Sequence, residues 1–151
     1  MAWIVVDLDD TLVTDSPTGV DPLMGDQPAP KQPVDGAVEA MQMLASEGHR
    51  LTVFTARFAP APATEKERLK QEIMQELASY GFPEMEVWTG TTKPAADIFI
   101  DNKAITFDQD WGLALAQLQE MLEARGLLPA MQPMEEEEGM PPPDTDPSQG
   151  A

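Results

Sequence analysis

The stretch "WIVVDLDDTLV", Trp3 to Val13, places a run of apolar residues directly before three carboxylates. Its first part, up to Val6, is apolar and partly β-branched and stops at an acid, which is typical of a buried strand in a parallel sheet. Acids at this point lie at the carboxyl end of the strand, where open α/β sheets bind their ligands. The stretch therefore predicts both an α/β fold and the place of a functional site.

Beyond this stretch, strand and helix patterns alternate along the chain. Strands are predicted at residues 51–57, 85–88 and 97–100, and helices from about Asp35 to Gly48, from Thr64 to Gly81 and at 111–125. Strands separated by amphipathic helices indicate a parallel sheet that is covered on both faces. We therefore expect a Rossmann-like three-layer α/β/α sandwich.

Two segments are expected to lie outside this sandwich. Residues 14–34 contain five prolines and several turn-forming aspartates, so a loop or flap is predicted there rather than a regular element. Residues 129–151 are rich in proline, glycine and acids and lack apolar periodicity, so a disordered tail is predicted. The remaining residues, 1–128, have the length of one ordinary domain.

Composition excludes several classes of partner. The net charge is −18, from 27 acidic and 9 basic residues, and such a field disfavours nucleic acid as a partner. No apolar run approaches the roughly 18 residues that a bilayer span needs, and the N-terminus shows no signal segment. Cysteine is absent, which suits a reducing compartment. A cytoplasmic protein without a membrane partner is expected.

Polar side chains follow three of the predicted strands, and these are the candidate site residues. Because the carboxyl ends of parallel strands meet at one edge of a sheet, we expect these side chains to converge. Converging carboxylates repel one another unless a cation lies between them, and oxygen ligands without His or Cys favour Mg²⁺. The residues are Asp7 and Asp9 after the first strand, Thr55 and Arg57 at the end of the second, Asp101 and Asn102 after strand 97–100, and Lys93 in the loop before it.

The order Asp-x-Asp-x-Thr, strand-Thr, Lys, strand-Asp resembles the haloacid dehalogenase superfamily of phosphotransferases and phosphatases. The resemblance covers residues 3 to about 122. The segment "TKPAADIFIDNKAI" (92–105) resembles the small capless phosphatases of phages and capsule-synthesis loci, in which Lys-Pro precedes a strand that ends in two acids. Neither the segment 13–50 nor the segment 57–93 has room for a cap domain, so an open site is expected.

The resemblance implies a phosphomonoester hydrolase that works through an aspartyl-phosphate intermediate. Asp7 would be the nucleophile. Asp9 would protonate the leaving oxygen and then deprotonate the attacking water. Thr55 and Lys93 would hold the phosphoryl oxygens, and Thr11 would brace the loop.

The same resemblance implies a Mg²⁺ site. Asp7, Asp101 and Asp9, the last through its backbone carbonyl, would hold the ion. Asn102 stands where relatives often carry a second acid; its amide oxygen can coordinate a metal but brings no charge, so weaker metal binding is expected. Asp10 occupies a position where many relatives have glycine, and no catalytic role is expected for it.

Several alternatives stay open at this point. Arg57 could bind the substrate phosphate or pair with an acid of the site. The substrate is expected to be a small phosphomonoester, either a sugar phosphate or a nucleotide; the alternatives are a non-catalytic scaffold of the same superfamily and a polynucleotide 3′-phosphatase. A response-regulator receiver is excluded, because its phosphoacceptor Asp would follow the third strand, and no Asp lies between Arg57 and Lys93.

Overall fold

The computed structural model describes residues 1–15 and 31–127, and the chain divides into two units. The first unit is Met1–Lys103 and the second begins at Ala104. Most of the predicted flap, residues 16–30, and the predicted tail, 129–151, lie outside the described residues. The predicted single domain over residues 1–128 therefore stays a prediction.

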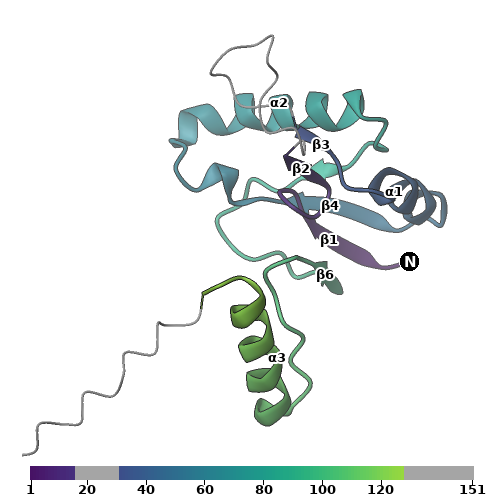
Figure 1. Ribbon diagram of the computed structural model, residues 1–151. Helices are drawn as coiled ribbons and strands as arrows, with labels where there is room; N and C mark the ends of the chain where they lie inside the picture. The colour runs from purple at the N-terminus through teal and green to yellow at the C-terminus, as the bar shows by residue number, and fades with distance from the viewer. Residues whose placement is uncertain (16–30, 128–151) are drawn as a thin grey trace, which may run out of the picture. The chain divides into compact units, whose positions relative to one another are not determined.

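A parallel sheet of four strands forms the centre of the first unit (Figure 1). The strand order is β5-β4-β1-β6, with β1 (Trp3–Asp7) between β4 (Arg50–Phe54) and β6 (Ile98–Ile100), and β5 (Glu86–Val87) outside β4. The first strand in sequence thus lies between two later ones, so the direction in which strands are added reverses at β1. Ligands of open α/β sheets bind at such a switch point. The predicted α/β fold with a central parallel sheet is confirmed.

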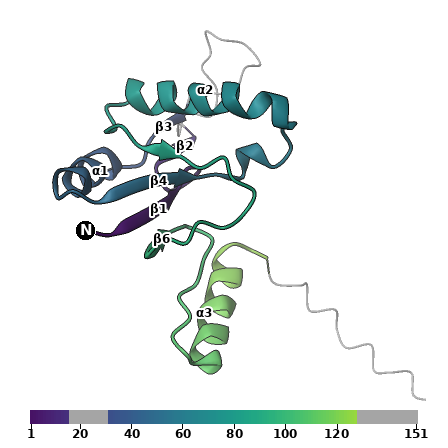
Figure 2. The same ribbon diagram turned by 180° about the vertical axis from the view of Figure 1, so that it is seen from behind.

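Helices flank this sheet (Figure 2). They are α1 (Ala37–Ser46) and α2 (Lys66–Ser79), and two short 3₁₀ helices, η1 (Ala56–Phe58) and η2 (Ala63–Glu65), precede α2. The predicted helices at these places are confirmed. The N-cap of α1 is Gly36, one residue after the predicted start of the helix at Asp35. Gly36 has φ of 80°, a left-handed conformation that glycine adopts without steric cost.

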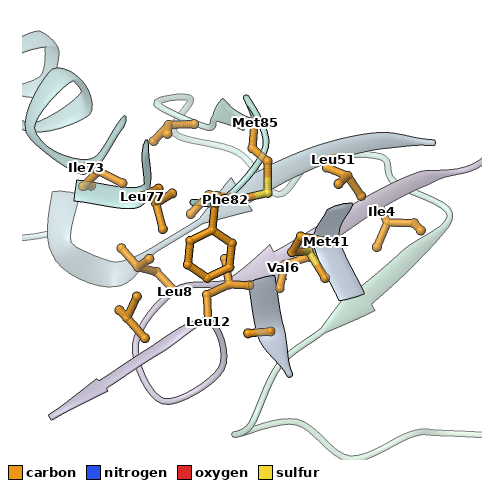
Figure 3. Packing of buried hydrophobic residues seen from close by; sticks show 14 of the residues in the cluster. Ile4, Val6, Leu8, Leu12, Met41, Leu51, Ile73, Leu77, Phe82 and Met85 are labelled. Atoms are coloured by element: carbon orange, nitrogen blue, oxygen red, sulfur yellow. The ribbon is translucent and has the colours of Figure 1, made fainter. Parts of the chain in front are cut away.

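One hydrophobic core joins the two helices to the same face of the sheet (Figure 3). Ile4 and Val6 alternate along β1 and point to this face, where they belong to one cluster with Met41 of α1 and with Ile73 and Leu77 of α2. All five side chains are less than 10% exposed. Burial of apolar surface is the main favourable term in folding, so this cluster fixes β1 and its carboxyl end in place. The second helical layer of the predicted sandwich stays a prediction.

Residues 14–34 were expected to form a loop without regular elements, but short strands lie at both ends of this segment. Strands β2 (Val13–Asp15) and β3 (Lys31–Pro33) pair antiparallel, with Val13 opposite Pro33 and Asp15 opposite Lys31. Proline is tolerated because an edge strand needs no donor on its outer side. The prediction was wrong at these residues because proline content describes local preference and carries no information about pairing between distant segments.

In the second unit, helix α3 (Trp111–Ala124) confirms the predicted last helix. Asp110 caps it, since its side chain accepts a hydrogen bond from the Leu113 N–H at 3.0 Å. Among the helices that the structure describes in the two units, none has the length and apolar character needed to cross a bilayer.

Candidate active site

The acidic loop after β1 is a tight turn organised around Leu8. The Leu8 carbonyl accepts hydrogen bonds from the N–H groups of Leu12 at 3.0 Å and Val13 at 3.1 Å. The Leu8 side chain is 0% exposed and lies in the core (Figure 3). Because successive side chains of an extended segment point to opposite sides, the burial of Leu8 leaves Asp7 and Asp9 on the open side of the turn.

Asp10 has an unusual backbone conformation in this turn. Its φ is 62°, in the left-handed region, and its Oδ1 accepts a hydrogen bond from the Thr14 hydroxyl at 3.1 Å. Aspartate is one of the few residues other than glycine that adopts this region readily. The backbone therefore gives a physical reason for the glycine that the resemblance leads one to expect at this position.

Side chains from three neighbouring strand ends meet at one cleft of about 600 Å³. Asp7 ends β1, Thr55 follows β4, and Asp101 follows β6, and all three line the cleft together with Asp9. Neighbouring strands lie about 4.8 Å apart, so side chains at adjacent strand ends are within reach of one ligand. The structure thus brings together four of the predicted site residues.

The Asp7 carboxyl is in an environment that disfavours its charge. Burial raises its pKa above the ordinary value, and the neighbouring carboxylate of Asp101 raises it further, with a smaller effect from Asp9. The Thr11 hydroxyl donates to Asp7 Oδ2 at 3.4 Å and acts in the opposite direction. This contact agrees with the bracing position expected for Thr11. A bound divalent cation would offset the repulsion between Asp7 and Asp101.

The Asp9 carboxylate, unlike that of Asp7, is paired with two cationic side chains, Arg57 and Lys31. Arg57 donates from Nε to Asp9 Oδ2 at 3.0 Å and from Nη2 to Oδ1 at 2.8 Å, and Lys31 Nζ lies 2.7 Å from the same Oδ1. The two hydrogen bonds from Arg57, followed by the one from Lys31, lower the pKa of Asp9 to about 2 although burial opposes them. In this arrangement Asp9 is ionised at neutral pH, whereas the expected role as an acid begins with a protonated carboxyl.

The two cations also connect the acidic loop to the rest of the unit. Arg57 Nη1 donates to Glu76 Oε2 on α2 at 3.0 Å. Of the two alternatives for Arg57, the structure therefore shows the pairing with acids. Lys31 is the first residue of β3, and its carbonyl accepts a hydrogen bond from the Tyr80 hydroxyl. Residue 31, at the base of the predicted flap, is thus tied both to Asp9 and to the end of α2.

Lys93 and Asn102 are placed differently from the four residues of the cleft. Lys93 is exposed and does not line the cleft; its Nζ lies 4.6 Å from the centre of the Phe99 ring. Asn102 directly follows Asp101 and is partly buried. The lysines that do line the cleft are Lys66 and Lys103. Phosphate binding by Lys93 and metal binding by Asn102 stay predictions.

The residues of the cleft fit Mg²⁺ through oxygen atoms. Asp7 and Asp101 line the same cleft, and burial followed by repulsion from Asp101 raises the pKa of Asp7. A hard divalent cation would offset both charges. The Asp9 carboxylate is already engaged by Arg57 and Lys31, so only its backbone carbonyl suits a metal. In residues 1–15 and 31–127, no three His, Cys, Asp or Glu side chains gather closely enough to hold a metal. The remaining ligands would be amide, carbonyl or water oxygens.

Several residues of the site were not predicted from the sequence. Lys31 lies in a segment predicted to be loop, and Glu76 is one of several acids along α2, so neither carried a signal. Phe54 and Trp88, which also line the cleft, follow or end strands just as Asp7 does. Their positions at the carboxyl ends of β4 and β5 could have indicated a role at the site.

No family model matches the chain, and no curated protein matches it. A solved structure of a conserved protein from Bacteroides thetaiotaomicron is similar, with a TM-score of 0.45 and 22% sequence identity over 79% of this chain and 90% of that one. Membership of the haloacid dehalogenase superfamily therefore stays a prediction from the motifs.

Proposed function

We propose that this protein is a Mg²⁺-dependent phosphomonoesterase that works through an aspartyl-phosphate intermediate. The observation that carries the proposal is the convergence of Asp7, Thr55 and Asp101, from three neighbouring strand ends, at one cleft. A nucleophilic carboxylate, a hydroxyl that can bind a phosphoryl oxygen and a second metal-binding carboxylate are the parts that this reaction needs. Their chain order is the one that the resemblance leads one to expect.

The reaction proceeds in two displacements at phosphorus. An oxygen of Asp7 attacks the phosphorus, the bond to the leaving oxygen breaks, and the departing alkoxide takes a proton. Water then attacks the phosphorus of the aspartyl-phosphate, loses a proton, and releases inorganic phosphate with Asp7 regenerated. Thr55 lines the cleft and is 7% exposed, and its hydroxyl would donate to a phosphoryl oxygen. A Mg²⁺ held by Asp7 and Asp101 would supply positive charge toward the phosphoryl group.

Asp9 moves the protons in this scheme, and its cation partners determine when it can do so. As long as Arg57 and Lys31 hold it, Asp9 is an anion that cannot donate. A phosphate dianion is a competing partner for the same two cations. If they turn to the substrate, Asp9 loses the interactions that lower its pKa and becomes able to carry a proton.

The test is hydrolysis of a generic aryl phosphate by the full chain, with and without millimolar Mg²⁺. We expect magnesium-dependent turnover in the wild type, and a loss of several orders of magnitude in Asp7→Asn, which keeps the shape but removes the nucleophile. Asp10→Asn is the matched control, because Asp10 is an exposed acid of the same turn with no part in the reaction. Turnover of Asp7→Asn within about tenfold of the control would contradict the proposal.

A non-catalytic scaffold is the alternative, and the same assay separates it. A scaffold would bind Mg²⁺ by calorimetry but hydrolyse neither the aryl phosphate nor a panel of sugar phosphates and nucleotides. That result would replace the phosphatase proposal.

A further inference from the structure

Two aromatic side chains stand in a row with Asp7 across the carboxyl edge of the sheet. Asp7 on β1 is in register with Phe54 on β4, and Val53 on β4 is in register with Val87 on β5. Trp88, the next residue, donates its backbone N–H to the Val53 carbonyl at 2.8 Å, so it stands beside Phe54. With strands about 4.8 Å apart, Phe54 is one strand and Trp88 two strands from Asp7.

The three side chains line the same cleft and belong to the same face of the sheet. Residues in register on parallel strands point to one side. The face of Asp7 also holds Trp3, four residues earlier, because every second side chain of a strand shares a face. The rings of Trp3 and Trp88 lie 6.1 Å apart, which places Trp88 on that face. Phe54 is 38% exposed, although phenylalanine is among the residue types most often fully buried.

The Trp88 indole is fixed in orientation. Its Nε1 donates to the Thr92 carbonyl at 2.9 Å. A side chain at Gly90 would begin 2.9 Å from two atoms of the indole, so the ring lies directly against the glycine backbone. Phe54 and the held indole of Trp88 therefore form a preorganised apolar wall, which we call the aromatic wall.

The chemistry of the cleft changes from one side to the other. Polar groups that suit a phosphoryl group and a metal are gathered around Asp7, and the cations Lys66 and Lys103 line the cleft as well. The same cleft is also lined by the aromatic wall and by the small apolar residues Ala56, Ala59 and Ala61, which offer no side-chain hydrogen bonds, with Thr91 the one further hydroxyl in the lining. The hydroxyls of a bare sugar would lose water against such a surface without gaining partners. A planar aromatic group gains both burial and stacking there.

We propose that the substrates are nucleoside monophosphates, whose base stacks on the aromatic wall while the phosphate lies at Asp7. This proposal rests on the proposed phosphatase function and narrows its substrate class. Nucleobases stack on aromatic side chains whatever their sequence, because every base has a π-face. A free nucleotide is favoured over a polynucleotide end because the chain carries a net charge of −18.

The test compares adenosine 5′-monophosphate with ribose 5-phosphate, which has the same phosphate and sugar but no base, under saturating Mg²⁺. The readout is the preference ratio, kcat/KM for the nucleotide divided by kcat/KM for the sugar phosphate. We expect the wild type to prefer the nucleotide at least tenfold and Phe54→Ala to lower the ratio about tenfold, which corresponds to about 1.4 kcal/mol of lost stacking. Gly90→Ala, which displaces the indole, should lower it in the same direction.

Two variants serve as controls. Phe54→Tyr keeps the ring and should keep the preference ratio, whereas Met43→Ala removes an exposed apolar side chain on α1, away from the cleft, and should leave the ratio unchanged. A wild-type ratio near one, or a ratio that Phe54→Ala does not change, would overturn the proposal. An oligonucleotide with a 3′-phosphate that is hydrolysed faster than the mononucleotide would overturn it in favour of a polynucleotide substrate.

Binding separates a failure of this proposal from a failure of the phosphatase proposal. Calorimetry of adenosine 5′-monophosphate with Asp7→Asn and Mg²⁺ needs no turnover. Binding that is weakened about tenfold when Phe54→Ala is added supports the aromatic wall even if no substrate is hydrolysed. Absence of binding, or binding indifferent to Phe54, contradicts the nucleotide proposal while aryl phosphate hydrolysis can still stand.

Discussion

The guanidinium of Arg57 holds the carboxylate of Asp9 with two hydrogen bonds, from Nε at 3.0 Å and from Nη2 at 2.8 Å. This bidentate geometry is the strongest form of an arginine–carboxylate pair. A third bond from the same guanidinium reaches Glu76 on α2. One arginine therefore connects the loop after β1, where the proposed chemistry occurs, with the helix that covers the sheet.

This pairing predicts a change in the pKa of Asp9. In Arg57→Ala without Mg²⁺, the pKa should rise from about 2 toward its ordinary value, because the largest favourable interaction of the carboxylate is lost. Lys31→Ala should raise it less, since the hydrogen bonds from Arg57 have the larger effect. The measurement is an NMR titration of the Asp9 carboxyl carbon in each variant. A larger rise in Lys31→Ala than in Arg57→Ala would contradict the assignment of the main partner.

The raised pKa of Asp7 predicts that this residue costs stability at neutral pH. The folded pKa lies above the ordinary value, so stability falls as pH rises from about 3.8 through the folded pKa and stays lower above it. Without Mg²⁺, Asp7→Asn should therefore melt at a higher temperature than the wild type at pH 7. The difference should shrink toward pH 3, where both side chains are neutral.

Mg²⁺ provides the control for this prediction, because it should stabilise the wild type more than Asp7→Asn. Free Mg²⁺ at 100 times its Kd would raise the free energy of unfolding of the wild type by about 2.7 kcal/mol. Equal melting temperatures at pH 7 without metal would show that the burial of Asp7 and its neighbour Asp101 do not strain the site.

The sequence predicted those parts of the fold that depend on local pattern. A strand that is buried on both faces is a nearly continuous apolar run in the sequence. Two such runs, one ending at Asp7 and one just before Thr55, therefore identified two strands and their carboxyl ends. The pairing of β2 with β3 was missed, because it joins Val13 to Pro33 across residues with no alternating pattern. Local propensity cannot report contacts between segments that the chain brings together only on folding.

The sequence likewise predicted the site residues that follow strands, but not the ones that reach the site through long side chains. Asp7, Thr55 and Asp101 were found because each follows a strand, and parallel strands place such positions at one edge. Lys31 and Glu76 were not found, because their role follows from the directions of long side chains toward Asp9 and Arg57. Charge in a sequence shows that a pair is possible, and only the structure shows which acid and base meet.

Leu8 is predicted to support the site through packing. Its side chain is 0% exposed between two acids that face the cleft. Leu8→Ala should lower the free energy of unfolding by about 2–5 kcal/mol, the usual range for a buried leucine. Met43→Ala, at a side chain that is 56% exposed, should change it by less than about 0.5 kcal/mol. Urea unfolding of both variants tests this, and a loss below 1 kcal/mol for Leu8→Ala would show that the turn is held by its hydrogen bonds alone.

Asn102 gives a prediction about the metal itself. Asn102→Asp adds a carboxylate directly beside Asp101, where the resemblance leads one to expect a second acid. If the side chain faces the metal, Mg²⁺ should bind more tightly, because an anionic oxygen replaces a neutral one. Calorimetric titration with Mg²⁺ measures the change, and Asp108→Asn, which alters an exposed acid outside the cleft-lining set, is the control for the effect of net charge. An unchanged Kd in Asn102→Asp would contradict this prediction and would mean that the residue at this position does not face the ion.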